Sequence, residues 1–385
     1  MKNIPYSDQH GFPAFLNIES AWPNPIVIQS VEIFEFDGTY LARATSSAGV
    51  IGTAICNSRV KYCLPILKNL VIPAFLGRDA RELESLINEV YSYKNNYKNH
   101  GMPFWNGVAY VEAALLDLLG KVTGRSVGAL VGEVLRRDIP IYLSSTRRDT
   151  SAEEEVDFMV ERVAETGARA VKMKVGGRMR NNADATPGRT ERIIALARER
   201  LGPEMTIYFD GNGSFDSEKA IEVGRLLEDH KCAFFEEPCP FEQYEATKAV
   251  ADALDIDVAG GEQDCNMAHF REMIRRRVVD VVQPDMMYNG GLVRALRVAR
   301  MAAEAGMTTT IHGTRHNPEL ATILHFASVT PNAGQFTEYP SKHVTFKSWY
   351  EPHFVVQPGG TVKLPDGPGL GVSYDEEIWK SARVL

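Results

Sequence analysis

The sequence of 385 residues predicts an α/β protein that consists mainly of a closed parallel barrel, preceded by an α+β domain. Between Ile139 and Pro340, eight short apolar or β-branched runs alternate with amphipathic helical segments. Three of these runs end in acids at a constant interval of 26 residues, namely Asp210, Glu236 and Glu262. An interval of that length suits one strand, one loop and one helix, so a (β/α)8, TIM-like barrel is favoured over a doubly wound sheet.

The N-terminal part contains an arm and a smaller domain. Residues 1–25 are irregular and hold several prolines and aromatic residues, so we expect either a disordered arm or a flap over a site. Residues 26–135 are predicted to form the α+β domain, with a hairpin that turns at Asp37-Gly38. Its main helix is predicted over 109–124, where apolar residues recur at three- and four-residue spacing and stop at a glycine.

The barrel is predicted over residues 136–340. Its expected strands span 139–145, 170–175, 205–210, 232–238, 256–262, 278–285, 308–313 and 334–340. The polar segment 176–189 is expected to be a loop over the barrel mouth, because it lengthens the interval between the second and third strands. Residues 341–385 lose the barrel pattern and are predicted to return to the N-terminal domain.

Composition limits the possible functions. The formal net charge of −8 argues against nucleic-acid binding, which normally requires a basic face. Five cysteines without a CxxC spacing indicate reduced thiols rather than a disulfide framework or a zinc site. The first residues lack the apolar core of a signal peptide, and no run of about 18 apolar residues occurs. We therefore expect a soluble, cytoplasmic protein without a membrane span.

A metal site is predicted at the carboxyl ends of the barrel strands, where catalytic residues of this fold lie. Three successive strands there carry Asp210, Glu236 and Glu262, which repel one another unless a cation or a neighbouring base neutralises them. An ion pair would explain a single acid, but three acids in register indicate a bound metal. Three oxygen ligands favour Mg²⁺ over zinc or copper.

Basic residues flank the three acids on both sides. Lys172 and Lys174 are two residues apart on the second strand and therefore point to one side. Lys174 is a possible general base if Lys172 and the metal lower its pKa. On the other flank, His312 of the seventh strand is a second acid/base group, which Asp285 of the sixth strand would orient.

Such an arrangement fits the removal of a proton α to a carboxylate. That proton is weakly acidic, so the developing enediolate requires a divalent cation beside it. Lys172 and Glu338 of the eighth strand, the latter protonated or hydrogen-bonding, would complete the electrophilic surroundings. A Lys or His base beside Mg²⁺ is the pattern of enolase-superfamily sites.

The motifs together resemble the mandelate racemase subgroup of the enolase superfamily, over roughly residues 27–375. They are KMK at 172–174, FDGN at 209–212, EEP at 236–238, GGE at 260–262, QPD and GG within 283–291, IHG at 311–313, EAALLDLLGK at 112–121 and PDGPGLG at 365–371. The resemblance implies a modified (β/α)7β barrel and an N-terminal capping domain that the C-terminal segment completes.

The resemblance also implies one essential Mg²⁺ per site. By motif, Asp210, Glu236 and Glu262 fall on the metal-ligand positions, with Glu236 preferred over Glu237 because the first acid of EEP holds the family role. Lys174 falls on the base position with Lys172 supporting it, Asp285 and His312 fall on the dyad, and Glu338 falls on the strand-eight acid.

Two features depart from the family pattern. The tight turn at Asp37-Gly38 replaces a loop that usually closes over the substrate. Our hypothesis is that residues 6–25 take the place of this loop, either in their own chain or across the interface of a homo-oligomer. Asn212 stands where several sugar-acid dehydratases have a third acid/base His. That difference disfavours those dehydratases, but not the ones that use the Lys and the His dyad alone.

The predicted first step leaves three reactions open: dehydration, racemisation or epimerisation, and cycloisomerisation. Dehydration of a sugar acid or diacid to a 2-keto-3-deoxy acid, a lyase reaction, is favoured because it is widespread among relatives with these bases, and the isomerase reactions are the alternative. Polar residues near the mouth suit a polyhydroxylated or dianionic small-molecule carboxylate: Asn212, Arg147, Arg148, Arg178, His316 and Asn317.

Two further classes are less favoured. A barrel glycosidase with Glu236 and Glu338 as its carboxylate pair leaves the two lysines and the other two acids of the trio unexplained. A non-catalytic binding barrel would be expected to have lost a metal ligand or a base, and none is lost here.

Overall fold

A parallel eight-stranded sheet, in the order β10-β9-β8-β7-β6-β5-β4-β11, forms the larger part of the computed structural model, which describes residues 13–179 and 181–385. Its strands are β4 (Asp138–Ser144), β5 (Ala170–Lys174), β6 (Thr206–Asp210), β7 (Phe234–Glu236), β8 (Asp257–Gly260), β9 (Val281–Val282), β10 (Thr308–Thr309) and β11 (Thr337–Pro340). The two ends of this order meet where Thr309 bridges Ala333, shortly before β11. The predicted barrel is therefore confirmed.

Several strands are shorter than the runs that predicted them. The ends of these runs leave the strand ladder, since Glu237 and Gly261 have positive φ angles of 40° and 117°, and Pro238 and Pro284 have no N–H to donate. The chain therefore turns out of the strands at the barrel mouth, and Glu262, Asp285 and His312 follow strand ends rather than lying within strands.

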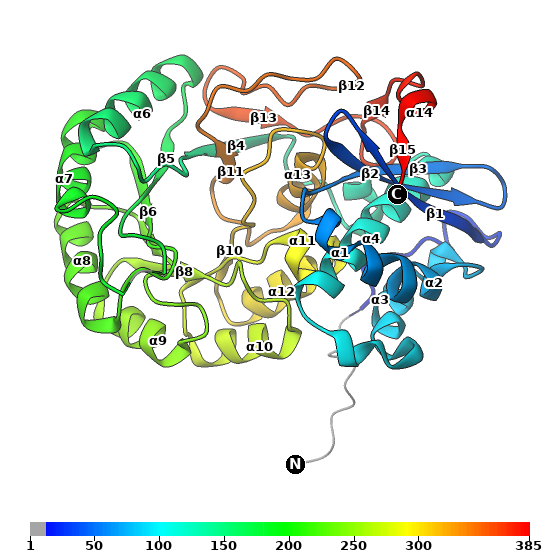
Figure 1. Ribbon diagram of the computed structural model, residues 1–385, viewed down its shortest axis with the longest axis horizontal. Helices are drawn as coiled ribbons and strands as arrows, with labels where there is room; N and C mark the ends of the chain where they lie inside the picture. The colour runs from blue at the N-terminus through cyan, green and yellow to red at the C-terminus, as the bar shows by residue number, and fades with distance from the viewer. Residues whose placement is uncertain (1–12, 180) are drawn as a thin grey trace, which may run out of the picture.

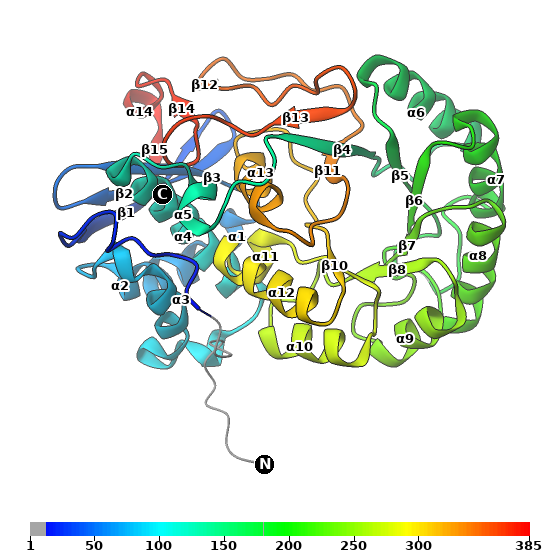
Figure 2. The ribbon, with the colours of Figure 1, turned by 180° about the vertical axis from the view of Figure 1, so that it is seen from behind.

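Seven helical connections join the eight strands within the part of the chain that the structure describes. Their main helices are α6 (Ala152–Thr166), α7 (Arg189–Leu201), α8 (Ser217–Asp229), α9 (Tyr244–Ala253), α10 (Met267–Arg276), α12 (Leu292–Glu304) and α13 (Leu320–Val329). Figures 1 and 2 show α6 to α10 as an outer ring around the strands. Seven connections among eight strands match the modified (β/α)7β barrel expected from the family resemblance.

The floor of the barrel is apolar and aromatic. Residues alternate between the two faces of a strand, so a residue that lies two positions before a predicted site residue also faces the barrel interior. These floor residues form one buried cluster of Tyr142, Ala170, Tyr208, Phe234, Ala259, Val281 and Phe336. Tyr208 and Phe234 stack with ring centroids 3.8 Å apart. The charged residues above therefore rest on a rigid floor.

An antiparallel sheet, β15-β1-β2-β3, forms the centre of the capping domain. Its strands are β1 (Ile28–Phe36), β2 (Thr39–Ser46), β3 (Ile51–Cys56) and β15 (Arg383–Val384). Asp37 and Gly38 have φ angles of 49° and 69°, as a tight hairpin turn requires. The pairing of β15 with β1 shows that the end of the chain completes this domain. The run after the turn, however, divides into two strands, β2 and β3.

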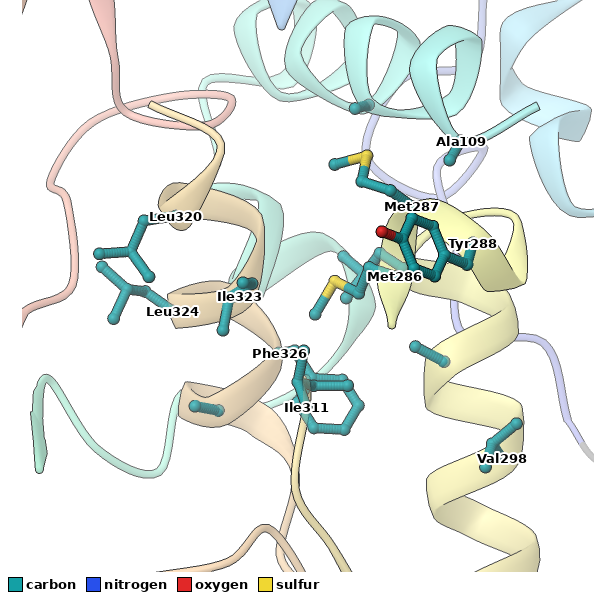
Figure 3. Packing of buried hydrophobic residues seen from close by; sticks show 14 of the residues in the cluster. Ala109, Met286, Met287, Tyr288, Val298, Ile311, Leu320, Ile323, Leu324 and Phe326 are labelled. Atoms are coloured by element: carbon teal, nitrogen blue, oxygen red, sulfur yellow. The ribbon is translucent and has the colours of Figure 1, made fainter. Parts of the chain in front are cut away.

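Helical segments make up the rest of the capping domain, and the longest of them contacts both its sheet and barrel residues 286–289. They are α1 (Val60–Ile66), η1 (Leu67–Val71), α2 (Ile72–Phe75), η2 (Ala80–Glu82), α3 (Leu83–Ser92), η3 (Tyr93–Asn99), α4 (Met102–Thr123) and α5 (Val127–Val131). Helix α4 is buried on all sides from Phe104 to Gly120 and ends at Gly124 in the left-handed conformation, as predicted. Figure 3 shows Met286, Met287 and Tyr288 between α4 and the helix α13.

The C-terminal segment is attached to α4 by a buried carboxylate. Asp117 accepts hydrogen bonds from the backbone N–H groups of Thr53 on β3 and Leu370, both at 2.8 Å, and pairs with Lys121 at 2.7 Å. The remaining elements of the segment are β12 (Tyr350–Glu351), β13 (Thr361–Lys363), β14 (Ser373–Tyr374) and α14 (Ile378–Ser381). The PDGPGLG motif therefore has a structural role in joining sheet, helix and tail.

The described part of the N-terminal arm does not cover the mouth of its own barrel. Arg300 donates a hydrogen bond to the Pro13 carbonyl at 2.7 Å, and its guanidinium lies 3.8 Å from the ring centroid of Phe15. Arg300 belongs to the last turns of α12, and helices of this barrel end beside the amino ends of the strands, away from the mouth. Pro13 and Phe15 thus lie away from the mouth of their own barrel. Residues 6–12 lie outside the described part, and the flap hypothesis for residues 6–25, which includes a homo-oligomer interface, stays a prediction (Figure 1).

Within the described residues, no helix is both long and apolar enough to cross a membrane.

Candidate active site

Three buried carboxylates meet at the barrel mouth. Asp210 and Glu236 end the neighbouring strands β6 and β7 and are paired in the parallel register, while Glu262 follows β8 by two residues. Each offers an oxygen atom, and these oxygens all lie within 4.8 Å of one another. The structure therefore brings together the acids for which the sequence predicts a metal-binding role.

The electrostatics of this trio fit a bound cation. Burial raises the pKa of Glu236 to about 8, and the charges of Asp210 and Glu262 add to this effect against the opposing charge of Lys172. Three buried carboxylates in this space need positive charge to remain ionised together. An all-oxygen donor set is the kind that Mg²⁺ prefers, so the residues fit this ion.

Glu237 lies beside the trio but faces differently. Its φ angle of 40° turns the chain out of the strand, and its Oε2 accepts a 3.2 Å hydrogen bond from the Asn212 side chain. Burial and the neighbouring Glu262 and Asp210 raise its pKa well above the ordinary value. Glu236, whose register matches that of Asp210, is the acid that joins the trio.

Two buried lysines occupy one flank. The Lys172 ammonium lies 2.6 and 2.8 Å from the two Glu236 oxygens and 3.0 Å from Glu338. Burial disfavours its charge, but Glu236 and Glu338 outweigh that cost and raise its pKa. Lys174 contacts Asp210 directly. Lys172 is therefore a fixed cation between two carboxylates, and Lys174 is the lysine at the edge of the trio.

The Asp285–His312 pair forms the opposite flank. His312 Nδ1 lies 2.9 Å from Asp285 Oδ2, while Asp285 Oδ1 accepts the backbone N–H groups of Met287 and Tyr288. Asp285 thereby caps the short helix α11 (Met286–Asn289) and is held in place at both oxygens. The geometry assigns a donated proton to Nδ1, and Nε2 lies 3.4 Å from Glu262 Oε2.

The charge state of His312 depends on its neighbours. Burial disfavours the imidazolium, but the charges of Glu262 and Glu338 and the hydrogen bond that His312 donates to Asp285 outweigh it and raise the pKa of His312 to about 10. Glu262 is the largest of the contributions that raise this pKa. Neutralising Glu262 with a cation would bring the pKa of His312 down, closer to the range useful for proton transfer.

Glu338 is a hydrogen-bonded carboxylate. It accepts hydrogen bonds from Ser144 Oγ and from the backbone N–H of Gly313, both at 2.7 Å. Burial opposes its ionisation, but Lys172 and His312 hold its pKa below the ordinary range. These contacts favour the hydrogen-bonding role of Glu338 over the protonated one, which stays a prediction. Since Gly313 follows His312, Glu338 also anchors the backbone that carries the histidine.

The residues proposed for substrate binding differ in their surroundings. Arg147 pairs with Glu155 of α6 at 3.1 Å, and its guanidinium lies 4.7 Å from the Phe158 ring centroid, also on α6. Arg178 is exposed and His316 is half-buried. For these three residues, substrate binding remains a prediction.

Asn212 and Arg148 connect the loops at the mouth. Arg148 donates a 2.8 Å hydrogen bond to the Asn212 side chain and further bonds to the carbonyl oxygens of Gly176 and Asp210. The Asn212 N–H donates to Asp210 Oδ1 at 2.7 Å. Arg148 therefore holds together the loops that follow β5 and β6, and Asn212 fixes a predicted metal ligand.

Three residues near the site have no role in the sequence prediction. Gln283 donates a 2.8 Å hydrogen bond to Glu236, and it lies two residues before Asp285 in the QPD motif. Arg315 pairs with Glu319 at 2.8 Å and lies 4.0 Å from Asp285. Tyr288 follows the dyad acid by three residues. The period of two along the strand could have indicated Gln283, whereas the loop positions carry no such signal.

Comparison with known proteins gives consistent results. The family model described as "Enolase C-terminal domain-like" matches residues 154–378. Arabinonate dehydratase of Saccharolobus solfataricus is 26% identical over 371 residues, covering 95% of this chain and 93% of that protein. D-galactarolactone cycloisomerase of Agrobacterium fabrum is 28% identical over 319 residues, covering 80% of this chain and 82% of that protein.

A solved structure is similar along nearly the whole chain. The mandelate racemase/muconate lactonizing protein from Paracoccus denitrificans PD1222, complexed with magnesium, superposes with a TM-score of 0.86 at 26% identity, covering 94% of this chain and 99% of that one.

Proposed function

Since the chain belongs to the enolase superfamily, as its match to the enolase C-terminal domain-like model establishes, we propose that it removes the proton α to the carboxylate of a sugar acid and dehydrates that acid to a 2-keto-3-deoxy acid. The catalytic residues in this proposal are Lys174 and the Asp285–His312 dyad. Asp210, Glu236 and Glu262 would hold one Mg²⁺.

One observation carries the proposal: a possible base lies at each end of the acidic trio. Lys174 contacts Asp210 at one end, and His312 Nε2 lies 3.4 Å from Glu262 at the other. A substrate carboxylate placed at the trio would therefore have its α-carbon between a lysine and a histidine. General acid–base catalysis of enolisation requires such a placement.

Each residue then has a definite task. Lys174 takes the α-proton, so that the α C–H bond breaks and its electron pair moves toward the carboxylate as an enediolate forms. A bound Mg²⁺ would neutralise the negative charge that develops on the carboxylate oxygens. The Lys172 cation, fixed by Glu236 and Glu338, adds a preorganised positive charge beside the trio.

His312 completes the dehydration. As the β C–O bond breaks, the hydroxyl leaves with the proton that His312 supplies, and the resulting enol tautomerises to the keto acid. Asp285 stabilises the imidazolium and keeps Nδ1 protonated, so that Nε2 exchanges the proton. Proton removal by Lys174 and departure of water assisted by His312 account for the overall loss of one water.

Isomerisation is the second possibility, favoured by the same two-sided geometry. If the acid has no β-hydroxyl in reach, a proton returned by His312 to the α-carbon gives the epimer or racemate. The cycloisomerase relative, 28% identical, supports cycloisomerisation of a lactone substrate as a third reaction. All three reactions share the first step and differ in what the enediolate does next.

The glycosidase alternative fits the contacts poorly. The ammonium of Lys172 lies within 3.0 Å of both Glu236 and Glu338, so this carboxylate pair is bridged by a cation. Glycosidase carboxylates instead flank the scissile bond and leave space for a sugar ring between them. A purely binding role would leave the paired bases without a purpose.

Incubation of the purified protein with a panel of aldonic and aldaric acids, with keto acid detected as its semicarbazone, tests the proposal. We expect keto acid to form with Mg²⁺, to disappear with EDTA and to return with added Mg²⁺. Deuterium at the α-carbon in D2O without keto product would favour the isomerase. Neither keto product nor deuterium with any acid would contradict the proposal.

A further inference from the structure

A polar cavity of about 520 Å³ lies between the capping domain and the barrel loops beside the dyad. Its capping-domain wall comes from the β1–β2 turn, from the residues that lead into α1, including Arg59, and from the first turn of α1, including Lys61. Its barrel wall contains Tyr288 of α11 and Arg315, Asn317 and Glu319 of the segment before α13. The proton-transfer chemistry described above uses none of these side chains.

The cavity carries a positive charge. Arg59 and Lys61 have no acidic partner among the residues that the structure describes: Arg59 Nε donates to the Tyr288 hydroxyl at 2.8 Å, and Lys61 lies over the Tyr62 ring. The one lining acid, Glu319, is neutralised by Arg315 at 2.8 Å. Two cations therefore remain uncompensated in a polar cavity, which favours an anionic occupant.

The position of Arg59 is fixed by buried groups. Its backbone N–H donates to the Asn57 side chain at 3.0 Å, and the same Asn57 oxygen accepts the hydroxyl of Tyr110 from α4 at 2.7 Å. Tyr288, which receives the guanidinium hydrogen bond, is only 6% exposed. Arg59 thus points into the cavity from a rigid support rather than from a free loop.

The cavity shares its wall with the catalytic dyad. The ring centroids of Tyr288 and His312 are 6.4 Å apart, and the backbone N–H of Tyr288 donates to Asp285 at 3.0 Å. Arg315 lies 4.0 Å from Asp285. A substrate whose α-carbon lies beside His312 would therefore extend its other end along Tyr288 toward Arg59. Figure 3 shows Tyr288 projecting from α11 beside Met286 and Met287.

We propose that this cavity binds a terminal anionic group of the substrate, through Arg59 and Lys61, and thereby selects acids charged at both ends. The inference rests on the proposed function, because it uses the α-carbon position at His312. The tight turn at Asp37-Gly38 is compatible with it, since from this turn only Gly38, Thr39 and Tyr40 line the cavity. Arginine and lysine bind either a second carboxylate or a phosphate in this way.

Equilibrium binding separates charge selection from turnover. We would titrate the Mg²⁺-loaded His312→Asn protein by calorimetry with an aldonic acid, the aldaric acid of the same configuration and the aldonic acid phosphorylated at its terminal carbon. The expected result is a dissociation constant at least roughly tenfold lower for the doubly charged acids than for the singly charged one. Adding Arg59→Gln and Lys61→Gln together should remove most of that difference.

Lys98→Gln, an exposed lysine of the capping domain outside the cavity, is the matched control and should keep the full difference. The identity of the anion follows from which doubly charged acid binds more tightly, and either one supports the site. Equal affinity for singly and doubly charged acids would overturn the inference, as would a difference that survives the double substitution in a folded protein. The proposed function fails separately, if the unsubstituted protein gives neither keto acid nor α-deuterium.

Discussion

The ammonium of Lys172 shows how closely the charges of the site depend on one another. It lies 2.6 Å from Glu236 and 3.0 Å from Glu338, and all three groups are fully buried or nearly so. Removing one member of a buried ion pair leaves the other charge without compensation, which costs about 3–5 kcal/mol. The lysine therefore contributes to the fold as well as to the proposed chemistry.

Lys172→Met should lower the free energy of unfolding by about 3 kcal/mol or more, because two buried carboxylates then face each other without a cation. Urea denaturation in the presence of EDTA measures this change. Lys68→Met, at an exposed position of the capping domain, is the control and should change stability by less than about 0.5 kcal/mol. Equal stability of both variants would contradict the assigned role.

A second buried residue, His325, predicts a pH dependence of stability. The Gly128 N–H donates to its Nδ1 at 3.2 Å, and its Nε2 lies 3.2 Å from the Leu370 carbonyl, so the neutral ring joins α5, α13 and the C-terminal segment. Burial lowers the pKa of His325 to about 4, from 6.5, against the smaller opposing effect of the Leu370 carbonyl. The unfolded chain therefore takes up the proton first as the pH falls.

This group should reduce stability as the pH falls from 6.5 to 4, by up to about 3 kcal/mol, and should have no effect above pH 6.5. Unfolding free energies of the native protein and of His325→Asn, measured across this range, isolate the contribution from that of the carboxylates. The native protein should lose more stability than the variant over the interval. Equal losses of unfolding free energy in the two proteins between pH 6.5 and 4 would show that His325 is not held neutral.

At the residue scale, the sequence motifs identify the side chains that meet at the mouth but not all of their partners. The strand-end spacing places Asp210, Glu236 and Glu262 correctly, because period and register determine where a strand-end residue lies. The destination of Arg147 depends on whether a loop turns outward to α6 or inward to the site. Nothing in a polar loop sequence specifies that direction.

Among the elements, the contact between α4 and α12 determines how the capping domain meets the barrel. Glu112 of α4 accepts the backbone N–H groups of Leu292 and Val293, at 2.5 and 2.9 Å, and so caps the first turn of α12 across the domain boundary. Gly291 lies against this carboxylate with a φ angle of 114°, and an added Cβ would collide with Glu112. A glycine is therefore required for the approach.

Gly291→Ala should destabilise the protein by more than about 2 kcal/mol, since it combines a left-handed backbone with a clash in a packed interface. Gly49→Ala is the matched control, because its φ angle is 83° but no atom lies near the added Cβ. The control should cost only about 1 kcal/mol. Denaturant unfolding of both variants measures the difference, and equal losses would show that Glu112 moves aside.

The elements also show where prediction from the sequence succeeds and fails. Barrel strands were placed by their spacing, and α4 by its periodicity, because both patterns arise from burial on defined faces. The arm has no such period. The aromatic side chain of Phe15 indicates a contact, but the sequence does not specify with which residue. Its contact with Arg300 joins residues that are far apart in the chain. Its position away from the mouth required the structure.

For the whole molecule, the fold places the proposed acid–base groups on the barrel, next to a cavity that the capping domain helps to line. The barrel supplies the trio, the lysines and the dyad, while the capping domain supplies Arg59 and Lys61 on the opposite wall of the neighbouring cavity. Chemistry and substrate choice would thus reside in different domains. Changes in the capping domain should alter which acid binds without altering the first chemical step.

Mg²⁺ should stabilise the whole protein if the trio binds it. At a concentration about 100 times its dissociation constant, the ion should add about 2.7 kcal/mol to the free energy of unfolding, because the unfolded chain has no assembled site. Thermal unfolding with and without Mg²⁺ measures the effect. Asp210→Asn together with Glu262→Gln should abolish it. A rise in melting temperature that persists in this variant would place the ion elsewhere.

The central claim is that Lys174 removes the α-proton of a carboxylic acid held between Lys174 and His312, and that His312 supplies the proton for the next step. Deuterium incorporation at the α-carbon, followed by NMR in D2O with Mg²⁺ and a sugar acid that the protein binds, tests it most directly. We predict incorporation or keto product with the native protein, neither with Lys174→Ala, and no keto product with His312→Asn, although both variants still bind Mg²⁺. Exchange at an unchanged rate in Lys174→Ala, or keto product at an unchanged rate in His312→Asn, would contradict the claim.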